Sequence, residues 1–198
     1  MTQPPASAHP QTAEVCTDRK TLRALLVARR HAIAPADRSA WDAQLGQQLL
    51  DWCSRTTMRS LAVYWPIQGE PDLRPVYRQL RALGMVLSLP VVRAAGAALD
   101  FALWEENAEL QVDRYGIAIP PVGATMLVPE ALLIPCVGFN ARGFRLGYGG
   151  GFYDRTLAQW PQATSLGLAY LCLQEEFAAG EYDIAMDQML TAGSVSAV

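Results

Sequence analysis

Apolar residues recur at helical spacing in four stretches of the chain. In the first of these, Leu22, Leu26 and Ile33 fall on one side of a helix that Asp18 is suited to cap, because its carboxylate can accept hydrogen bonds from the first free amides. Pro35 suits the first turn of the second helix. We expect helices over residues 18–32, 35–53, 72–83 and 152–160.

Shorter apolar runs, bounded by glycine, proline and polar residues, predict buried strands. We expect strands over residues 60–67, 85–92, 98–104, 132–139 and 165–172. The first two flank a predicted helix, and a unit of this kind closes right-handed with its two strands parallel. The sequence therefore predicts an α/β fold, a single three-layer α/β/α domain that is Rossmann-like with a largely parallel sheet.

Residues 1–17 differ from the rest of the chain, since they are rich in proline, alanine, serine and glutamine. A segment of this composition buries too little apolar surface to fold by itself. We therefore expect a disordered leader over residues 1–17 and one domain over residues 18–198. A single domain also agrees with the length of 198 residues, for which about one domain is the prior expectation.

Composition excludes several classes of function. The formal net charge is −3, so we expect no nucleic-acid partner. No apolar run reaches the ~18 residues of a membrane span, so we expect no membrane partner. The four cysteines are scattered without a CxxC pair, which favours reduced thiols in the cytoplasm. We expect a cytoplasmic monomer that acts on small molecules.

The segment RLGYGGGFYDR, residues 145–155, holds four glycines in five positions between two arginines. Glycine lets backbone amides approach an anion closely, and guanidinium groups supply positive charge for a phosphate. The helix expected from residue 152 would point its free amides into the same loop. The segment has neither the Gly-Lys-Ser/Thr of a Walker A motif nor the third glycine of a dinucleotide fingerprint. It predicts a phosphate-binding loop, with an ordinary strand-to-helix connection as the alternative.

Basic residues form a stripe on the first predicted helix. Arg19, Arg23 and Arg30 fall within about 40° of one another when successive residues are turned by 100°. They could therefore act together on one anionic ligand, although a solvated helix face would give the same pattern.

Together with the strand before it, the glycine-rich segment resembles the signature of the 5-formyltetrahydrofolate cyclo-ligase family, whose members are also called methenyltetrahydrofolate synthetases. The resemblance is close over residues 133–155, LIPCVGFNARGFRLGYGGGFYDR. It extends more weakly to the first helix and to residues 64–70, 115–117 and 183–191. It implies a single three-layer α/β domain over residues 18–198.

The resemblance also implies an activity. ATP as co-substrate and Mg²⁺ as cofactor would drive closure of 5-formyltetrahydrofolate into 5,10-methenyltetrahydrofolate, with release of ADP and phosphate. ATP would phosphorylate the formyl oxygen, the second folate nitrogen would attack the activated carbon, and phosphate would leave. The protein's part would be placement and charge neutralisation.

Individual residues are assigned roles by the same resemblance. The expected ATP-binding residues are Arg19, Lys20, Arg23, Arg145, Leu146, Gly147, Tyr148, Gly149, Gly150, Gly151, Phe152 and Tyr153. The expected folate-binding residues are Trp65, Glu70, Tyr115, Tyr148, Gly149, Gly150, Gly151 and Phe152. The expected magnesium ligands are Asp154 and Asp187. Arg19 stands where the family usually has lysine and Lys20 follows it, so either side chain could reach phosphate.

Simpler structural roles compete with these assignments. Trp65 and Tyr115 could be core aromatics, and Glu70 could belong to a solvated turn. Asp154 could serve only as a favourable charge at a helix N-terminus, and Asp187 could lie in an exposed turn or cap a strand.

Two other functions stay open at this point. Departures from the family pattern at Arg19, Ile119 and Phe152 would suit a non-catalytic folate or nucleotide sensor. Another ATP-dependent phosphotransferase on the same scaffold would keep the loop but use a different acceptor. Turnover of 5-formyltetrahydrofolate separates the expected enzyme from both.

Overall fold

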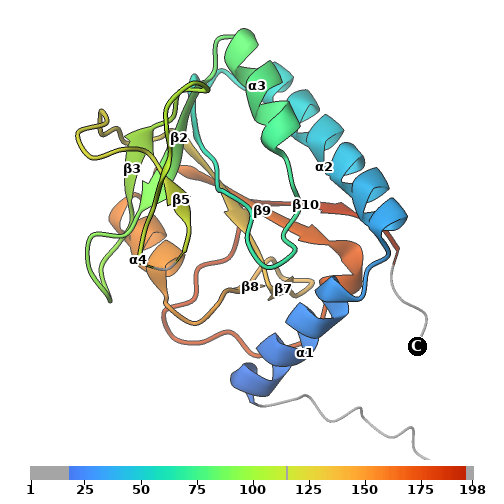
Figure 1. Ribbon diagram of the computed structural model, residues 1–198. Helices are drawn as coiled ribbons and strands as arrows, with labels where there is room; N and C mark the ends of the chain where they lie inside the picture. Colours follow the sequence, from blue (N-terminus) through green and yellow to red (C-terminus); the bar gives the residue numbers. More distant parts are fainter. Residues whose placement is uncertain (1–17, 115, 195–198) are drawn as a thin grey trace, which may run out of the picture.

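A computed structural model describes residues 18–114 and 116–194 of the chain. Its centre is a sheet of six strands in the order β10-β9-β6-β1-β2-β3, in which all neighbouring pairs are parallel except β2 and β3 (Figure 1). The predicted α/β fold with a largely parallel sheet is confirmed. The predicted leader, residues 1–17, lies outside the described residues.

Helices precede β1, β2 and β9, whereas β2 to β8 follow one another without a helix between them. The helices are α1 (Arg19–His31), α2 (Pro35–Arg55), α3 (Arg74–Ala82), α4 (Phe152–Gln159) and the short 3-10 helix η1 (Leu171–Leu173). The strands of the central sheet are β1 (Ser60–Ala62), β2 (Val86–Val91), β3 (Asp100–Leu103), β6 (Ala131–Pro135), β9 (Thr164–Tyr170) and β10 (Gln188–Ala192). Two small hairpins consist of β4 (Gln111–Val112) with β5 (Ala118–Ile119), and β7 (Gly138–Phe139) with β8 (Arg145–Leu146).

Successive residues of the central strands point to opposite faces of the sheet, and this builds three layers. Leu61 belongs to the core cluster that also holds residues of α2 and α3, whereas Ala62 belongs to the cluster around Leu157 of α4. Leu133 and Leu132 of β6 divide between the two clusters in the same way. Figure 1 shows α2 and α3 together on one side of the sheet and α4 on the other.

Two predicted strands end earlier than expected. The strand predicted over residues 60–67 ends at Ala62, because the chain leaves the sheet after Val63 and Pro66 has no amide to continue the ladder. The strand predicted over residues 132–139 is divided at Pro135, and its end forms β7 beside β8. Strands β4, β5, β8 and β10 were not expected from the sequence.

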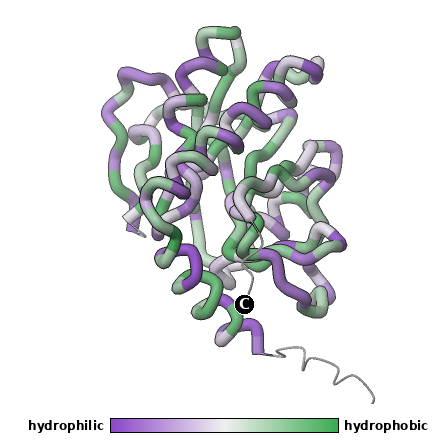
Figure 2. The backbone as a smooth tube through the Cα atoms, turned by 90° about the vertical axis from the view of Figure 1, so that its right-hand side faces the viewer, coloured by the Kyte–Doolittle hydropathy of each residue, from purple (hydrophilic) through white to green (hydrophobic). Residues whose placement is uncertain are grey.

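Helix α1 lies at the carboxyl end of the sheet, apart from α2 and α3, and packs against η1. Asp18 caps it, since its carboxylate accepts hydrogen bonds from the amides of Lys20 and Thr21. Leu26 packs directly on Gly138 of β7, where any side chain would collide with it. Figure 2 shows polar and apolar positions alternating along α1. Leu22 and Leu26 thereby hold one side of the helix against the core.

Within the part of the chain that the structure describes, no helix is long and apolar enough to cross a membrane.

Candidate active site

A cleft of about 540 Å³ lies where the chain leaves the carboxyl ends of β1, β2 and β6. This is the edge at which open parallel sheets place their ligands. Among the side chains and backbone that line it are those of Arg19, Arg23, Trp65, Glu70, Arg145, Leu146, Gly147, Tyr148, Gly149, Gly150, Gly151, Phe152, Tyr153, Asp154 and Asp183. The structure therefore brings together nearly all of the predicted site residues.

The glycine-rich loop connects β8 to α4 along one side of the cleft. Gly149 has φ of 94° and Gly151 has φ of 64°, a left-handed conformation that residues with a side chain adopt only with strain. Gly151 is also the N-cap of α4 and offers no side-chain oxygen to the free amides of the first turn. The guanidinium of Arg155 donates to the carbonyls of Gly150 and Ala97, and so connects the loop to the segment before β3. No described side chain caps the first turn of α4, so an acceptor in the cleft can receive hydrogen bonds from this turn.

Two arginines of α1 face this loop. The Arg23 Nε donates to the carbonyl of Gly147 over 2.8 Å, and the rest of its guanidinium lies beside Gly149. Arg19 forms an ion pair with Asp183, and its Nε is buried without a hydrogen-bond partner among the described residues. Lys20 is exposed and does not line the cleft. Of the two candidates in this position, the structure places Arg19 at the cleft.

Asp154 lies in the first turn of α4 and lines the cleft. Its Oδ1 pairs with Nη2 of Arg145 over 2.9 Å and accepts a hydrogen bond from the amide of Ile184 over 3.2 Å. Both contacts use the same carboxylate oxygen, so Oδ2 has no hydrogen-bond partner among the described residues. Arg145 itself is buried and donates to the carbonyl of Ile184. Asp154 is therefore held in place by one oxygen and presents the other.

Asp183 also lines the cleft, whereas Asp187 does not. Burial alone would raise the pKa of Asp183, but hydrogen bonds from the Arg19 guanidinium and the Gly180 amide lower it below its usual value, so the group is a carboxylate at neutral pH. Asp187 is exposed and accepts hydrogen bonds from the amide and hydroxyl of Ser165 at the start of β9. Asp187 was expected to bind magnesium together with Asp154. In the structure it instead links the beginnings of β9 and β10, outside the cleft.

Glu70 is the most deeply buried acid of the cleft, with 4% of its surface exposed. Its Oε2 accepts from the amide of Ile67 over 3.0 Å, and its Oε1 accepts from the Tyr148 hydroxyl over 3.0 Å. Burial raises the pKa of Glu70 from 4.5 to about 7, although these two hydrogen bonds and the nearby charge of Arg30 oppose the rise. The alternative of a solvated turn is therefore excluded for Glu70.

Aromatic side chains form the apolar part of the cleft. Trp65 is half-buried, packs edge-on against Trp104 with ring centroids 6.3 Å apart, and carries the Arg74 guanidinium over its ring. The ring of Phe152, the first residue of α4, lies against Gly150 of the glycine-rich loop. Tyr115 lies outside the described residues. These rings and the buried Glu70 give the cleft one polar anchor within an apolar wall, a combination typical of pockets for flat heterocycles.

Sequence reasoning missed two residues of this site. Asp183 was overlooked because Asp187 follows it by four positions, and spacing alone does not say which of them reaches the cleft. Arg30 was grouped with Arg19 and Arg23 on one helix stripe but was given no role; in the structure it is fully buried and donates to the Tyr148 hydroxyl over 2.6 Å. The shared stripe was the only signal for it.

The donor set suits a polyphosphate and a hard cation. Arg19, Arg23, the glycine-rich loop and the carboxylates of Asp154 and Asp183 all line the same cleft. Within residues 18–114 and 116–194, no three side chains of His, Cys, Asp and Glu gather as a complete metal site. Mg²⁺ is typically held by one or two carboxylates together with water and phosphate oxygens, so two carboxylates fit it.

Comparison with known proteins gives a consistent result. A model of the 5-formyltetrahydrofolate cyclo-ligase family matches residues 15–191. The 5-formyltetrahydrofolate cyclo-ligase of Escherichia coli (strain K12) is 31% identical over 175 residues, covering 84% of this chain and 96% of that protein. The protein of the same name from Mycolicibacterium smegmatis is 30% identical over 182 residues, covering 86% of this chain and 91% of that one.

Solved structures agree in fold. A 5,10-methenyltetrahydrofolate synthetase from Mycoplasma pneumoniae superposes with a TM-score of 0.74 at 24% identity, covering 88% of this chain and 98% of that chain. The NMR structure of Aquifex aeolicus 5,10-methenyltetrahydrofolate synthetase gives a TM-score of 0.75 at 27% identity, covering 87% and 89% respectively. Over nearly its whole described length, the chain belongs to the 5-formyltetrahydrofolate cyclo-ligase family.

Proposed function

We propose that this protein uses ATP and Mg²⁺ to close 5-formyltetrahydrofolate into 5,10-methenyltetrahydrofolate, releasing ADP and phosphate. The observation that carries the proposal is the meeting of two unlike half-sites in one cleft. The glycine-rich loop, Arg19 and Arg23 offer charge and amides to phosphates, and Glu70 lies in the same cleft among aromatic rings. Family membership makes the folate the expected partner for the second half-site.

The phosphate half-site would receive the ATP polyphosphate. Amides at the start of α4 and the guanidinium groups of Arg19 and Arg23 would hold its oxygens. Asp154 and Asp183 would hold the magnesium ion, which when bound neutralises charge on the transferred phosphoryl group. Arg145 would keep Asp154 in place through the oxygen that faces away from the metal.

The folate half-site would orient the reacting atoms. The Glu70 carboxylate would accept hydrogen bonds from N–H groups of the pterin ring, and Trp65 would pack against the folate. The formyl oxygen then attacks the terminal phosphorus and ADP leaves. The second folate nitrogen attacks the activated formyl carbon and the five-membered ring closes. That nitrogen then gives up its proton to water or to the departing phosphate as the carbon–oxygen bond breaks. Positioning accounts for most of this catalysis, since no residue needs to bond covalently to the substrate.

A spectroscopic assay tests the proposal directly. Purified protein is mixed with 5-formyltetrahydrofolate, ATP and Mg²⁺, and the near-ultraviolet absorbance of the methenyl product is followed together with ADP release. We expect both signals to rise in step and to vanish when any component is omitted. Folate and nucleotide binding with no product would favour a ligand sensor. ADP release that depends on some other acceptor would favour a different phosphotransferase.

We propose in addition that the protein acts as a monomer in the cytoplasm, where ATP and reduced folates are available. Sedimentation of the purified protein at the concentrations used in the assay tests this, and a dimer that persists on dilution would contradict it.

A further inference from the structure

Arg30 is a buried cation without an ion pair to any carboxylate among the described residues. Its side chain is 0% exposed, and its Nε and Nη1 donate to the carbonyls of Gln68 and Cys136 over 3.1 and 3.4 Å. Its Nη2 donates to the Tyr148 hydroxyl over 2.6 Å. An arginine cannot shed its proton, and a buried charge is costly unless something balances it. The group that balances Arg30 must therefore lie beyond these three acceptors.

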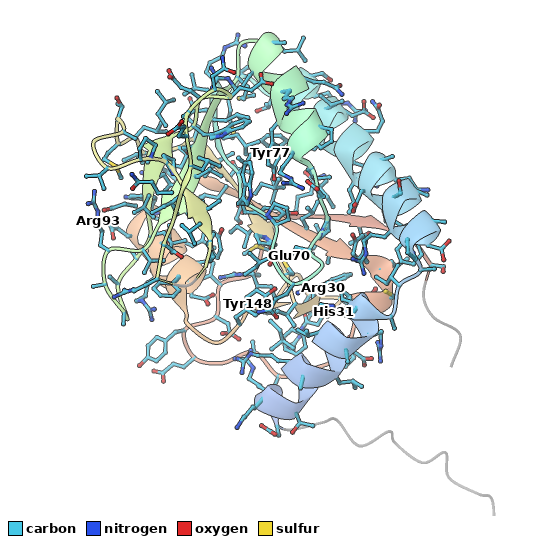
Figure 3. The ribbon with its side chains drawn as sticks, viewed as in Figure 1. Arg30, His31, Glu70, Tyr77, Arg93 and Tyr148 are labelled. Atoms are coloured by element: carbon cyan, nitrogen blue, oxygen red, sulfur yellow. The ribbon has the colours of Figure 1, made fainter. Side chains whose placement is uncertain are left out.

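The Tyr148 hydroxyl connects Arg30 to Glu70. A phenol has one proton to donate, and because its oxygen accepts from Arg30, that proton is directed to Oε1 of Glu70, 3.0 Å away. The Arg30 guanidinium also lies 5.8 Å from the centre of the Tyr148 ring. Figure 3 shows the three labelled side chains gathered between α1 and the sheet. One residue of α1, one of the glycine-rich loop and one of the segment after β1 thus form a chain of hydrogen bonds.

Other groups that act electrostatically on Glu70 carry no charge near neutral pH. Burial raises the pKa values of Tyr64 and Tyr77 well above the usual value, and it raises the pKa of Tyr153 likewise. Burial raises the pKa of the Cys136 thiol to about 11. Within the part of the chain that the structure describes, Arg30 is the one permanent charge that acts on Glu70 from the surrounding elements α1, α3, α4, β1, β6 and the glycine-rich loop.

From this geometry we infer that Arg30 is a positioning residue, which works through the Tyr148 hydroxyl to keep Glu70 in its charged form and aimed into the cleft. This inference rests on the proposed function, since it concerns how the acid that would recognise the pterin ring is prepared. It also gives Tyr148 a role that its place in a phosphate-binding loop does not explain. Glu70 with a proton would lose an acceptor for pterin N–H groups, so folate binding should depend on pH through this chain of hydrogen bonds.

The test measures binding of 5-formyltetrahydrofolate by calorimetry, without ATP, between pH 5.5 and 9. Arg30→Met removes the charge and keeps a side chain of similar length. Tyr148→Phe removes only the hydroxyl, and because Tyr148 is 44% exposed, this variant should keep the fold of the protein. Arg30→Lys restores charge without the planar fork. Arg29→Met is the matched control, because Arg29 is the neighbouring arginine of α1 and pairs with Glu175 at the surface. ADP binding by each variant verifies an intact cleft.

Wild-type protein should bind the folate more weakly as pH falls through about 7. Arg30→Met and Tyr148→Phe should both move the midpoint of this profile upward by about one pH unit, and weaken binding at pH 7 by up to about tenfold. Arg30→Lys should move it less, and Arg29→Met should leave it unchanged. The inference is overturned if the midpoints of Arg30→Met and Tyr148→Phe coincide with that of wild type.

Two outcomes keep this inference separate from the proposed function. If Arg30→Met does not fold, the midpoint of Tyr148→Phe decides alone. If wild-type protein binds ADP but no reduced folate at any pH, the proposed function fails, and the role of Arg30 in it fails for that reason. Folate binding by wild type with unshifted variants would refute only the role of Arg30.

Discussion

Nη2 of Arg145 lies 2.9 Å from Oδ1 of Asp154, and this ion pair joins the start of β8 to the first turn of α4 across the glycine-rich loop. This ion pair fixes both ends of the loop while leaving Oδ2 of Asp154 directed elsewhere. Arg19 and Asp183 form a second pair in the same cleft. Each of these ion pairs therefore places an arginine, suited to bind phosphate, next to a carboxylate, suited to bind a metal ion.

Changing Asp154 to Asn should raise the Mg²⁺ concentration for half-maximal activity by about tenfold or more, because a neutral amide is a weaker ligand for a hard cation. The Asn oxygen can still accept from Arg145, so thermal unfolding should show a modest loss of about 1–3 kcal/mol. Activity measured against Mg²⁺ concentration gives the result.

Asp187→Asn is the matched control, with the same change of side chain outside the cleft. It weakens the hydrogen bonds to Ser165 and should lower stability without altering the dependence on Mg²⁺. If Asp187→Asn needed more Mg²⁺ and Asp154→Asn did not, the metal ligand would be Asp187 and not Asp154.

Gly149→Ala and Gly123→Ala form a second matched pair, since the two glycines have φ of 94° and 92°. Each alanine should reduce stability by a similar amount, about 1–2 kcal/mol, because the left-handed conformation penalises a Cβ. Only Gly149 lies in the cleft and beside Arg23, while a Cβ at Gly123 meets open space. Steady-state kinetics should show an increased KM for ATP in Gly149→Ala alone, and equal kinetic losses in both variants would argue against a phosphate-binding loop.

Arg23→Ala should raise the KM for ATP by about tenfold, the effect of losing one charged hydrogen bond worth roughly 1.5–3 kcal/mol. Thermal stability should change less, since within the described residues the side chain holds only the Gly147 carbonyl. Lys20→Ala, on the exposed side of α1, should leave the KM for ATP unchanged. The reverse ranking of the two variants would place Lys20 at the phosphates.

Glu70 should make the protein less stable as pH rises. Its pKa is about 7 in the folded protein against 4.5 ordinarily, so between these values the folded state binds more protons than the unfolded one. The free energy of unfolding should therefore fall across pH 4.5 to 7, by roughly 3 kcal/mol at about 1.4 kcal/mol per pH unit. Denaturant unfolding of wild type and Glu70→Gln gives the difference, and parallel pH profiles for the two proteins would contradict the burial of this acid.

Sequence reasoning succeeded where the signal is local. The capping carboxylate of Asp18, the glycines before α4 and the alternating helices and strands all follow from residues close in sequence. The helix stripe also placed Arg19 and Arg23 correctly on the side that faces the cleft. Such features depend on backbone preferences and residue spacing, which can be recognised within a short segment of sequence.

What escaped prediction depends on contacts between distant segments. Strand β10 is five residues long and gains its identity from pairing with β9, not from its own pattern. The choice between Asp183 and Asp187 is decided by where the chain passes the cleft. The burial of Glu70 and its connection to Arg30 require three segments to meet, and no spacing within one of them shows it.

Arg19 opens the first helix and Asp183 precedes the last strand, yet the two side chains touch across 164 positions of sequence. A fragment that stops before residue 183 would therefore hold the whole glycine-rich loop but lack the carboxylate that pairs with Arg19. The two ends of the domain must meet before this side of the cleft is complete.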